Sequence, residues 1–209
     1  MEITKEFLQS KNACSPSYRW VVENNLIGLE HPEFIAKLME NNRFSDANWL
    51  ITKLFDKMQS VKYAIFAAEQ VLDIYEKKYP DDDRPRKAIG AAKKYLKNPN
   101  AKTADAVDAA ADDAYDAARA ADAAARAADA AYDARAAYAA AAYAAAARAA
   151  ADAAYAAYAV YARADDAARA AADAADAADA ADAADAADAA ADAGGIKISI
   201  INFGLELLK

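Results

Sequence analysis

An alanine-rich tract of about ninety residues constrains this chain more than any other feature of its sequence. It runs from Ala104 to Ala193 without a glycine or a proline, and it closes on six successive Asp-Ala-Ala triplets at residues 173–190. Alanine has the highest helix propensity and the smallest apolar side chain. The tract is therefore committed to helix, but it has few large side chains from which to build a core.

The larger core-forming side chains lie on either side of this tract. Leu, Ile, Val, Phe, Trp and Met are concentrated before residue 97 and after residue 195. This distribution predicts three parts: a helical head domain at 1–100, the Ala-rich helical tract at 101–193 and a C-terminal segment at 194–209. Ile196, Ile200, Phe203 and Leu207 recur at helical spacing, so we expect that segment to form a helix that packs on the head.

The head carries the start signals of several helices. Ser15-Pro16 and His31-Pro32 each place a proline in a first helical turn. Ser45-Asp46 precedes another apolar face, and Ser60 precedes the most regular one. Pro80 ends that helix, and the next begins within residues 81–85. Because no convincing pair of strands appears, the fold class predicted for the whole chain is all-α.

The length of the tract predicts that it folds back on itself. A straight helix of this length would extend about 135 Å at 1.5 Å per residue. We therefore expect a hairpin or bundle, with a turn at Asp112-Asp113 or at Asp165-Asp166, because aspartate caps new helices. Gly194-Gly195 would then end the tract as a C-cap.

The Asp-Ala-Ala triplets differ from the rest of the tract. Their aspartates are three residues apart, so each lags a full helical turn by about 60° and the series spirals around the helix. This spacing predicts a segment with no apolar face to bury. It would be an exposed helical rod, an acidic spiral for a partner, or a partly frayed helix. A repeat produced by slippage, with little function, is the alternative.

The charge of the tract suggests the kind of partner. It holds 18 Asp and six Arg, a net charge of −12 in a chain of net charge −8, which leaves the remainder at about +4. An acidic surface argues against nucleic acid and favours a basic protein partner. Simple solubilisation of an Ala-rich helix is the alternative, and Ala-rich helices also allow a homo-oligomer.

Two groups of residues are candidate sites. The first is a protein-binding set on the front and middle of the tract: Asp112, Tyr115, Asp116, Asp122, Asp129, Tyr132, Tyr138 and Tyr143. The second is a basic cluster that could hold a phosphate or another ligand near helix starts: Arg84, Arg86, Lys87, Lys93 and Lys94. Packing of the tyrosines, and a solvated Lys/Arg face, are the structural alternatives.

The residues that most enzymes need are scarce. His31 is the sole histidine and Cys14 the sole cysteine, and the few glycines do not form a phosphate loop. We predict no catalytic site, cofactor or metal. The N-terminus has no apolar signal region, and charges interrupt every long apolar stretch, so we expect a cytoplasmic chain without a membrane partner.

Several segments of the chain carry a resemblance to a known family. They are residues 63–69, 76–89 and 91–96, with the fairly specific Asp83-Arg-Pro-Arg-Lys-Ala motif, followed by the Ala-rich tract and the closing segment 204–208. The chain resembles the immunity proteins called Imm-5-like, found in bacteria and phages. The resemblance implies a non-enzymatic inhibitor that neutralises a partner toxin or effector by occlusion.

Two other functions remain open at this level. One is a phage counter-defence protein that inhibits a host immune protein or sequesters a nucleotide signal through the basic cluster. The other is an ice-binding or structural helix, because Ala-rich helices with aspartate resemble type I antifreeze proteins in composition. Those proteins use regularly spaced threonines, however, and Thr103 is the only threonine in or next to the tract.

Overall fold

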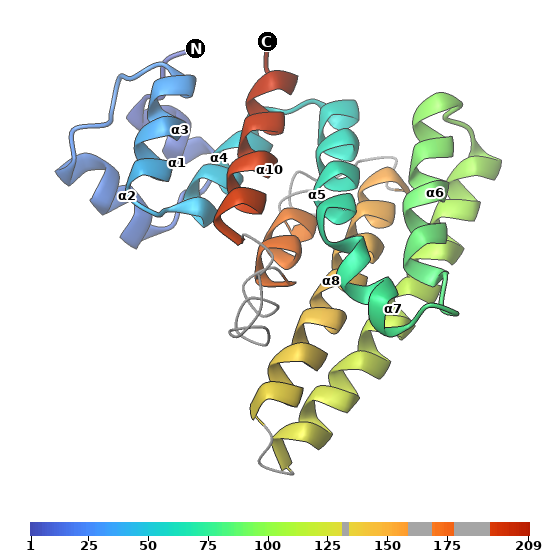
Figure 1. Ribbon diagram of the computed structural model, residues 1–209. Helices are drawn as coiled ribbons and strands as arrows, with labels where there is room; N and C mark the ends of the chain where they lie inside the picture. Colours follow the sequence, from blue (N-terminus) through green and yellow to red (C-terminus); the bar gives the residue numbers. More distant parts are fainter. Residues whose placement is uncertain (131–133, 159–168, 178–192) are drawn as a thin grey trace.

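The computed structural model is built of α-helices (Figure 1). It describes residues 1–130, 134–158, 169–177 and 193–209. Within these residues, extended pairing is limited to one bridge between Glu2 and Glu30. The predicted all-α fold is confirmed. None of the described helices combines the length and apolar character needed to cross a bilayer.

Four short helices form the first part of the head. They are α1 (Lys5–Ser10), α2 (Ser15–Glu23), α3 (His31–Glu40) and α4 (Phe44–Leu54). Pro16 and Pro32 lie in the first turns of α2 and α3, as predicted. Sequence analysis missed α1, which begins after Thr4; the Thr4 hydroxyl accepts the backbone N–H of Phe7.

Two longer helices complete the head. Helix α5 (Lys57–Lys78) begins before Ser60, because Asp56 and Gln59 form a capping box there. Ser60 lies inside the helix and donates its hydroxyl to the Asp56 carbonyl. Helix α6 (Arg84–Lys97) follows, with Pro85 in its first turn. The predicted start at Ser60 is thus wrong by one helical turn.

The tract folds back as a hairpin of two long helices, α7 (Ala101–Ala130) and α8 (Ala134–Tyr158), which lie side by side (Figure 1). A turn at Asp112-Asp113 is therefore wrong: α7 runs through both residues, and both side chains are exposed on it. High alanine propensity makes an internal break costly, and nothing there removes a backbone donor. The alternative turn, Asp165-Asp166, lies outside the described residues.

Alanines provide much of the contact between the tract and the head. Ala114, Ala117 and Ala118 on α7 and Ala146 and Ala149 on α8 are almost fully buried. Helix α6 packs on α7, and α5 packs on α8. Because the alanine side chain is a single methyl group, helices that meet through alanines can pack very closely. A larger side chain at one of these positions would force the helices apart.

The alanines of the first Asp-Ala-Ala triplets are buried, whereas Asp173 is half-buried and Asp176 is exposed. The prediction that these triplets lack an apolar face is therefore wrong at the described residues. Residues 169–177 are helical, and the buried triplet alanines are Ala174, Ala175 and Ala177; Ala170 and Ala171, just before the triplets, are buried as well. Two ion pairs join this segment to α8: Arg169 with Asp152 at 3.1 Å and Arg148 with Asp173 at 4.0 Å. The later residue of α8, Asp152, pairs with the earlier residue of the segment, Arg169, and the reverse holds for Arg148 and Asp173. The two segments are therefore antiparallel. The rest of the triplets lie outside the described residues.

The C-terminal helix α10 (Ala193–Leu207) packs on α4 and α5, as predicted. Phe203 stacks on Phe66 with ring centroids 4.1 Å apart. Gly204 allows this close approach, because a Cβ there would lie 2.8 Å from side-chain atoms of both Ile51 and Tyr63. Gly194 and Gly195 do not form a C-cap; both lie in the first turn of α10.

Candidate functional site

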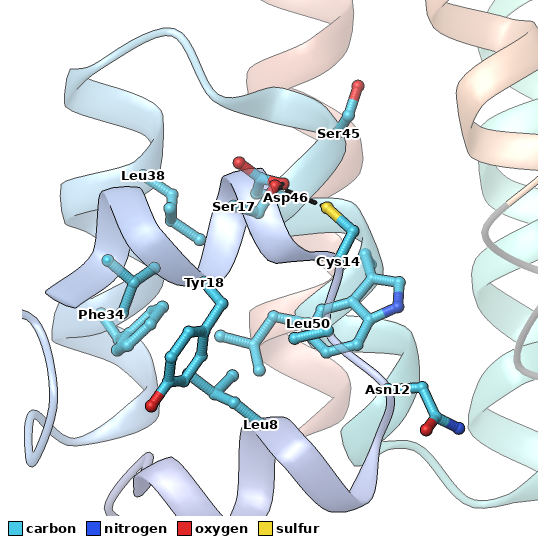
Figure 2. Close-up of a pocket in the computed structure, with 13 residues that line it drawn as sticks. Leu8, Asn12, Cys14, Ser17, Tyr18, Phe34, Leu38, Ser45, Asp46 and Leu50 are labelled. Carbon is cyan, nitrogen blue, oxygen red and sulfur yellow. Dashed lines mark hydrogen bonds between the residues drawn. The ribbon is translucent and has the colours of Figure 1, made fainter.

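The head encloses a cavity of about 270 Å³ among α1, α2, α3 and α4 (Figure 2). We call it the head cavity. Its apolar floor is formed by five buried side chains: Leu8, Val21, Phe34, Leu38 and Leu50. The half-buried rings of Tyr18 and Trp49 complete the walls. A cavity of this kind, mostly apolar with a few polar groups on one side, is the usual form of a small-ligand site.

Helical spacing places these side chains on facing surfaces. Phe34 and Leu38 are four residues apart on α3, and Asp46 and Leu50 are four apart on α4. Residues at this spacing share a helix face. The two faces meet across the cavity, and α1 contributes Leu8, its single buried residue.

Five polar side chains line the cavity, and three of them, Cys14, Ser17 and Asp46, form a hydrogen-bonded rim on one side (Figure 2). The other two, Asn12 and Ser45, are exposed. The Cys14 thiol donates to the Ser17 hydroxyl across 3.1 Å, and Ser17 donates to Oδ1 of Asp46 across 2.7 Å. Cys14 and Ser17 lie at the start of α2, and Asp46 lies in the first turn of α4. The rim therefore ties two helix starts together.

Arg43 completes the rim from outside the cavity. Its guanidinium donates to Oδ2 of Asp46, and Nη2 donates to Ser17 across 3.3 Å. The same guanidinium lies over the ring of Trp20, 4.4 Å from the ring centroid, an arrangement typical of cation–π contact. Arg43 and Asp46 balance each other's charge, so the rim is polar but has no net charge.

The head cavity has no signature in the sequence. Its residues are spread over positions 8–50 and four helices, and none forms a recognisable motif. In the sequence, Cys14 stands out only as the sole cysteine. The pairing of Ser17 with Asp46 joins residues 29 positions apart, and only tertiary packing could reveal it.

The predicted protein-binding residues are only partly brought together. Asp112, Tyr115 and Asp116 are exposed on one face of α7, and Tyr115 is 42% exposed. Tyr143 is half-buried on α8 and packs edge-on against Tyr79, with centroids 5.8 Å apart. The remaining members lie outside what the structure describes: the side chains of Asp122, Asp129 and Tyr138, and the whole of Tyr132.

The predicted basic cluster lies entirely on α6, where most of its charges are paired. Arg84 binds Asp82 with two bonds of 2.8 and 2.6 Å, and Lys87 pairs with Asp83 at 2.9 Å. Arg86 pairs with Glu76 on α5, and Lys93 pairs with Glu69 on the same helix; Lys94 is exposed. The pairs of Arg86 and Lys93 tie α6 to α5. All four pairs reduce the positive charge available to a phosphate.

The Arg84 pair also affects the ionisation of its partners. Hydrogen bonding from Arg84 lowers the pKa of Asp82 from its ordinary 3.8 to about 2. Burial raises the pKa of the Tyr75 hydroxyl, which donates to the same carboxylate across 2.7 Å. Elsewhere, within the described part of the chain, no cluster of three or more His, Cys, Asp or Glu side chains could hold a metal ion.

Comparison with known proteins gives one similarity. Residues 1–58 match the family of the YdhT N-terminal domain. No curated protein and no solved structure matches the chain. The matched region contains α1 to α4 and the beginning of α5, and it does not reach the Ala-rich helices. Every residue that lines the head cavity therefore lies in the part of the chain that is similar to the YdhT N-terminal domain.

Proposed function

We propose that this chain is a non-enzymatic, immunity-type inhibitor that neutralises a partner toxin or effector by covering its functional surface. The observation that carries the proposal is the exposed face of α7 formed by Asp112, Tyr115 and Asp116, which we call the α7 acidic face. Its residues were predicted as protein-binding from the sequence. The resemblance to Imm-5-like immunity proteins supports the same function.

The α7 acidic face is held rigidly. The opposite side of α7 is buried against α6 and α8 through alanines, so the exposed side chains project from a fixed backbone. A preorganised surface loses less conformational entropy when it binds. Such a surface suits a partner that is itself folded.

Its chemistry favours a basic protein. Asp116 pairs with the exposed Arg119 at 3.9 Å. Asp105 and Asp113 are also exposed on α7 and keep the surroundings of the face net negative. Carboxylates of this kind steer a cationic partner and set its orientation. Tyr115 adds an exposed aromatic ring of the type that often anchors protein interfaces. The expected partner therefore presents basic side chains around an apolar pocket.

The direct experiment is a protection assay with the product of a neighbouring toxin gene. Co-expression of the full chain should restore growth of cells that produce the toxin, and the purified pair should form a stoichiometric complex. Replacing Asp112 and Asp116 by Lys should weaken this complex by about tenfold or more, with the largest loss at low salt. Tyr115→Ala should weaken it with little dependence on salt.

Glu33→Lys is the matched control. Glu33 is exposed on α3, away from α7, and its replacement reverses a charge in the same way. This variant should bind like the wild type. A toxin complex unaffected by both the charge reversals and Tyr115→Ala would rule out the α7 acidic face. Absence of protection and of complex formation with the neighbouring toxin would overturn the immunity function itself.

A further inference from the structure

We propose that the head cavity binds a small, neutral aromatic molecule that carries an N–H or O–H donor. This site is separate from the α7 acidic face and lies in a different part of the chain. The proposal rests on three observations: the size of the cavity, the composition of its floor and the hydrogen-bonding state of its rim.

Size limits the ligand to one or two rings. The cavity volume is about 270 Å³. An apolar cavity of about 150 Å³ is known to take up benzene in another protein. The head cavity therefore has room for a bicyclic aromatic group such as indole, but not for a nucleotide or a long lipid chain.

The apolar side chains of the cavity floor favour a ligand with a flat, apolar group. Leu8, Phe34 and Leu50 are buried beneath the cavity, and the half-buried rings of Tyr18 and Trp49 line it. Aromatic rings pack well against one another in offset or edge-on geometry. Burial of apolar surface would supply most of the affinity, because the lining is mainly apolar and its two polar side chains outside the rim, Asn12 and Ser45, are exposed to solvent.

The hydrogen bonds of the rim determine which polar group the ligand should carry. The donors of Cys14, Ser17 and Arg43 that meet there are already engaged, since each bonds to Ser17 or Asp46. The Asp46 carboxylate retains capacity, because a carboxylate has about four lone-pair sites and each oxygen accepts from one residue here. A ligand N–H or O–H would donate to one of the remaining lone pairs of the Asp46 carboxylate.

Charge then argues for a neutral ligand. An anionic head group would lie beside Asp46, and a cationic one would compete with Arg43 for the same carboxylate. Because the Arg43–Asp46 pair is already balanced, either charge would leave an unpaired ion beside an apolar cavity. A neutral donor avoids this cost.

Indole is the probe for the test, titrated into the isotope-labelled full-length chain and followed by two-dimensional NMR. We expect saturable shift changes at the cavity residues, a Kd below about 1 mM, and nuclear Overhauser contacts from indole protons to the rings of Tyr18 and Trp49. These contacts locate the probe in the wild-type protein, so the test does not depend on a variant that folds.

Two matched probes test the chemical class. 1-Methylindole has the same rings without the N–H donor and should bind about fivefold more weakly. Indole-3-acetate adds a negative charge and should bind more weakly still. If 1-methylindole or indole-3-acetate bound as tightly as indole, the proposed donor or neutrality requirement would be overturned.

A pair of variants tests the location. Ala13→Trp should fill the cavity from its half-buried wall and abolish the shift changes. Val22→Phe, in the shallow groove beside the cavity, should leave indole binding unchanged. Binding that survives in a folded Ala13→Trp protein would overturn the proposal. So would the absence of both saturation and ring contacts in the wild type.

Discussion

The core formed by α4, α5 and α10 and the core formed by α7, α8 and residues 169–177 are built on opposite principles. In the first, large side chains such as Tyr63, Ile51 and Ile200 are fully buried. In the second, nearly every buried residue is an alanine. Both cores are all-helical, and the residues named here are buried in each. They differ in which side chains set the distance between neighbouring helices.

The difference shows where specificity comes from in each core. Large side chains in the head interlock by shape, as with Phe66 on Phe203, and the buried Tyr63 hydroxyl donates to Asn48 across 3.1 Å. Alanines provide no comparable shape. In the tract, register is marked instead by the Arg169–Asp152 and Arg148–Asp173 pairs.

Truncation in the head should have the largest effect. Ile51→Ala removes a fully buried side chain between α4 and α10 and should lower the free energy of unfolding by about 2–5 kcal/mol. Ile198→Ala, at a position 54% exposed on α10, is the matched control and should change it little. Urea denaturation measures both. Equal losses would show that the head core does not depend on large side chains.

Enlargement should be the damaging change in the tract. Ala146 on α8 is fully buried, so Ala146→Leu should force the helices apart and cost about 1–3 kcal/mol. Ala120→Leu, at an exposed position of α7, should stay within about 0.5 kcal/mol of the wild type. Leucine and alanine have similar helix propensities, so the difference reports packing. A neutral Ala146→Leu would contradict the close packing.

A carboxylate in the head should stabilise the fold at neutral pH. The pKa of Asp82 falls to about 2 in the folded protein from an ordinary 3.8, so its contribution is present above pH 4 and is lost as the pH falls towards 2. Asp82→Asn should cost about 1–2 kcal/mol at pH 7 and nearly nothing at pH 2. Asp81→Asn, at the exposed neighbour, is the control for urea titrations at the two pH values.

The smallest effect, of opposite sign, is expected at a carboxylate in the tract. Burial raises the pKa of Asp173, against the opposing influence of Asp152 and Arg148. The pKa of this carboxyl is higher in the folded protein than in the unfolded chain. The folded state therefore gains stability as the pH falls through that pKa and loses it as the pH rises. Asp173→Asn should therefore unfold no more easily than the wild type at pH 7. Lowering the pH towards 4 should favour the wild type over this variant; a shift in the other direction would contradict the assignment.

Much of the fold could be predicted because its signals are local. Proline in the first turns of α2 and α3 and the alanine content of α7 and α8 act within a few residues of backbone. The errors occurred where two local signals competed. Asp56 with Gln59 caps α5 better than Ser60 does, and a doubled aspartate does not interrupt an alanine helix.

The candidate sites were less predictable. Exposure of Asp112, Tyr115 and Asp116 follows from a polar stripe that helical geometry keeps on one face, so the α7 acidic face could be predicted. The carboxylate partners of Arg86 and Lys93 could not, because Glu76 and Glu69 belong to another helix. The head cavity could not be predicted either, since a cavity is defined by what neighbouring helices fail to fill.

The sequence by itself determined that this chain is all-helical, that its alanine-rich middle is helical and folds back on itself, and that its last helix packs on the head. Helix propensity and apolar spacing suffice for these features, because both act along the chain. Tertiary structure alone decided which methyl groups are buried, including those of the first Asp-Ala-Ala triplets, and that Ser17 meets Asp46 beside an apolar cavity. Such contacts join residues distant in sequence, and their free energy depends on the complete arrangement of the helices.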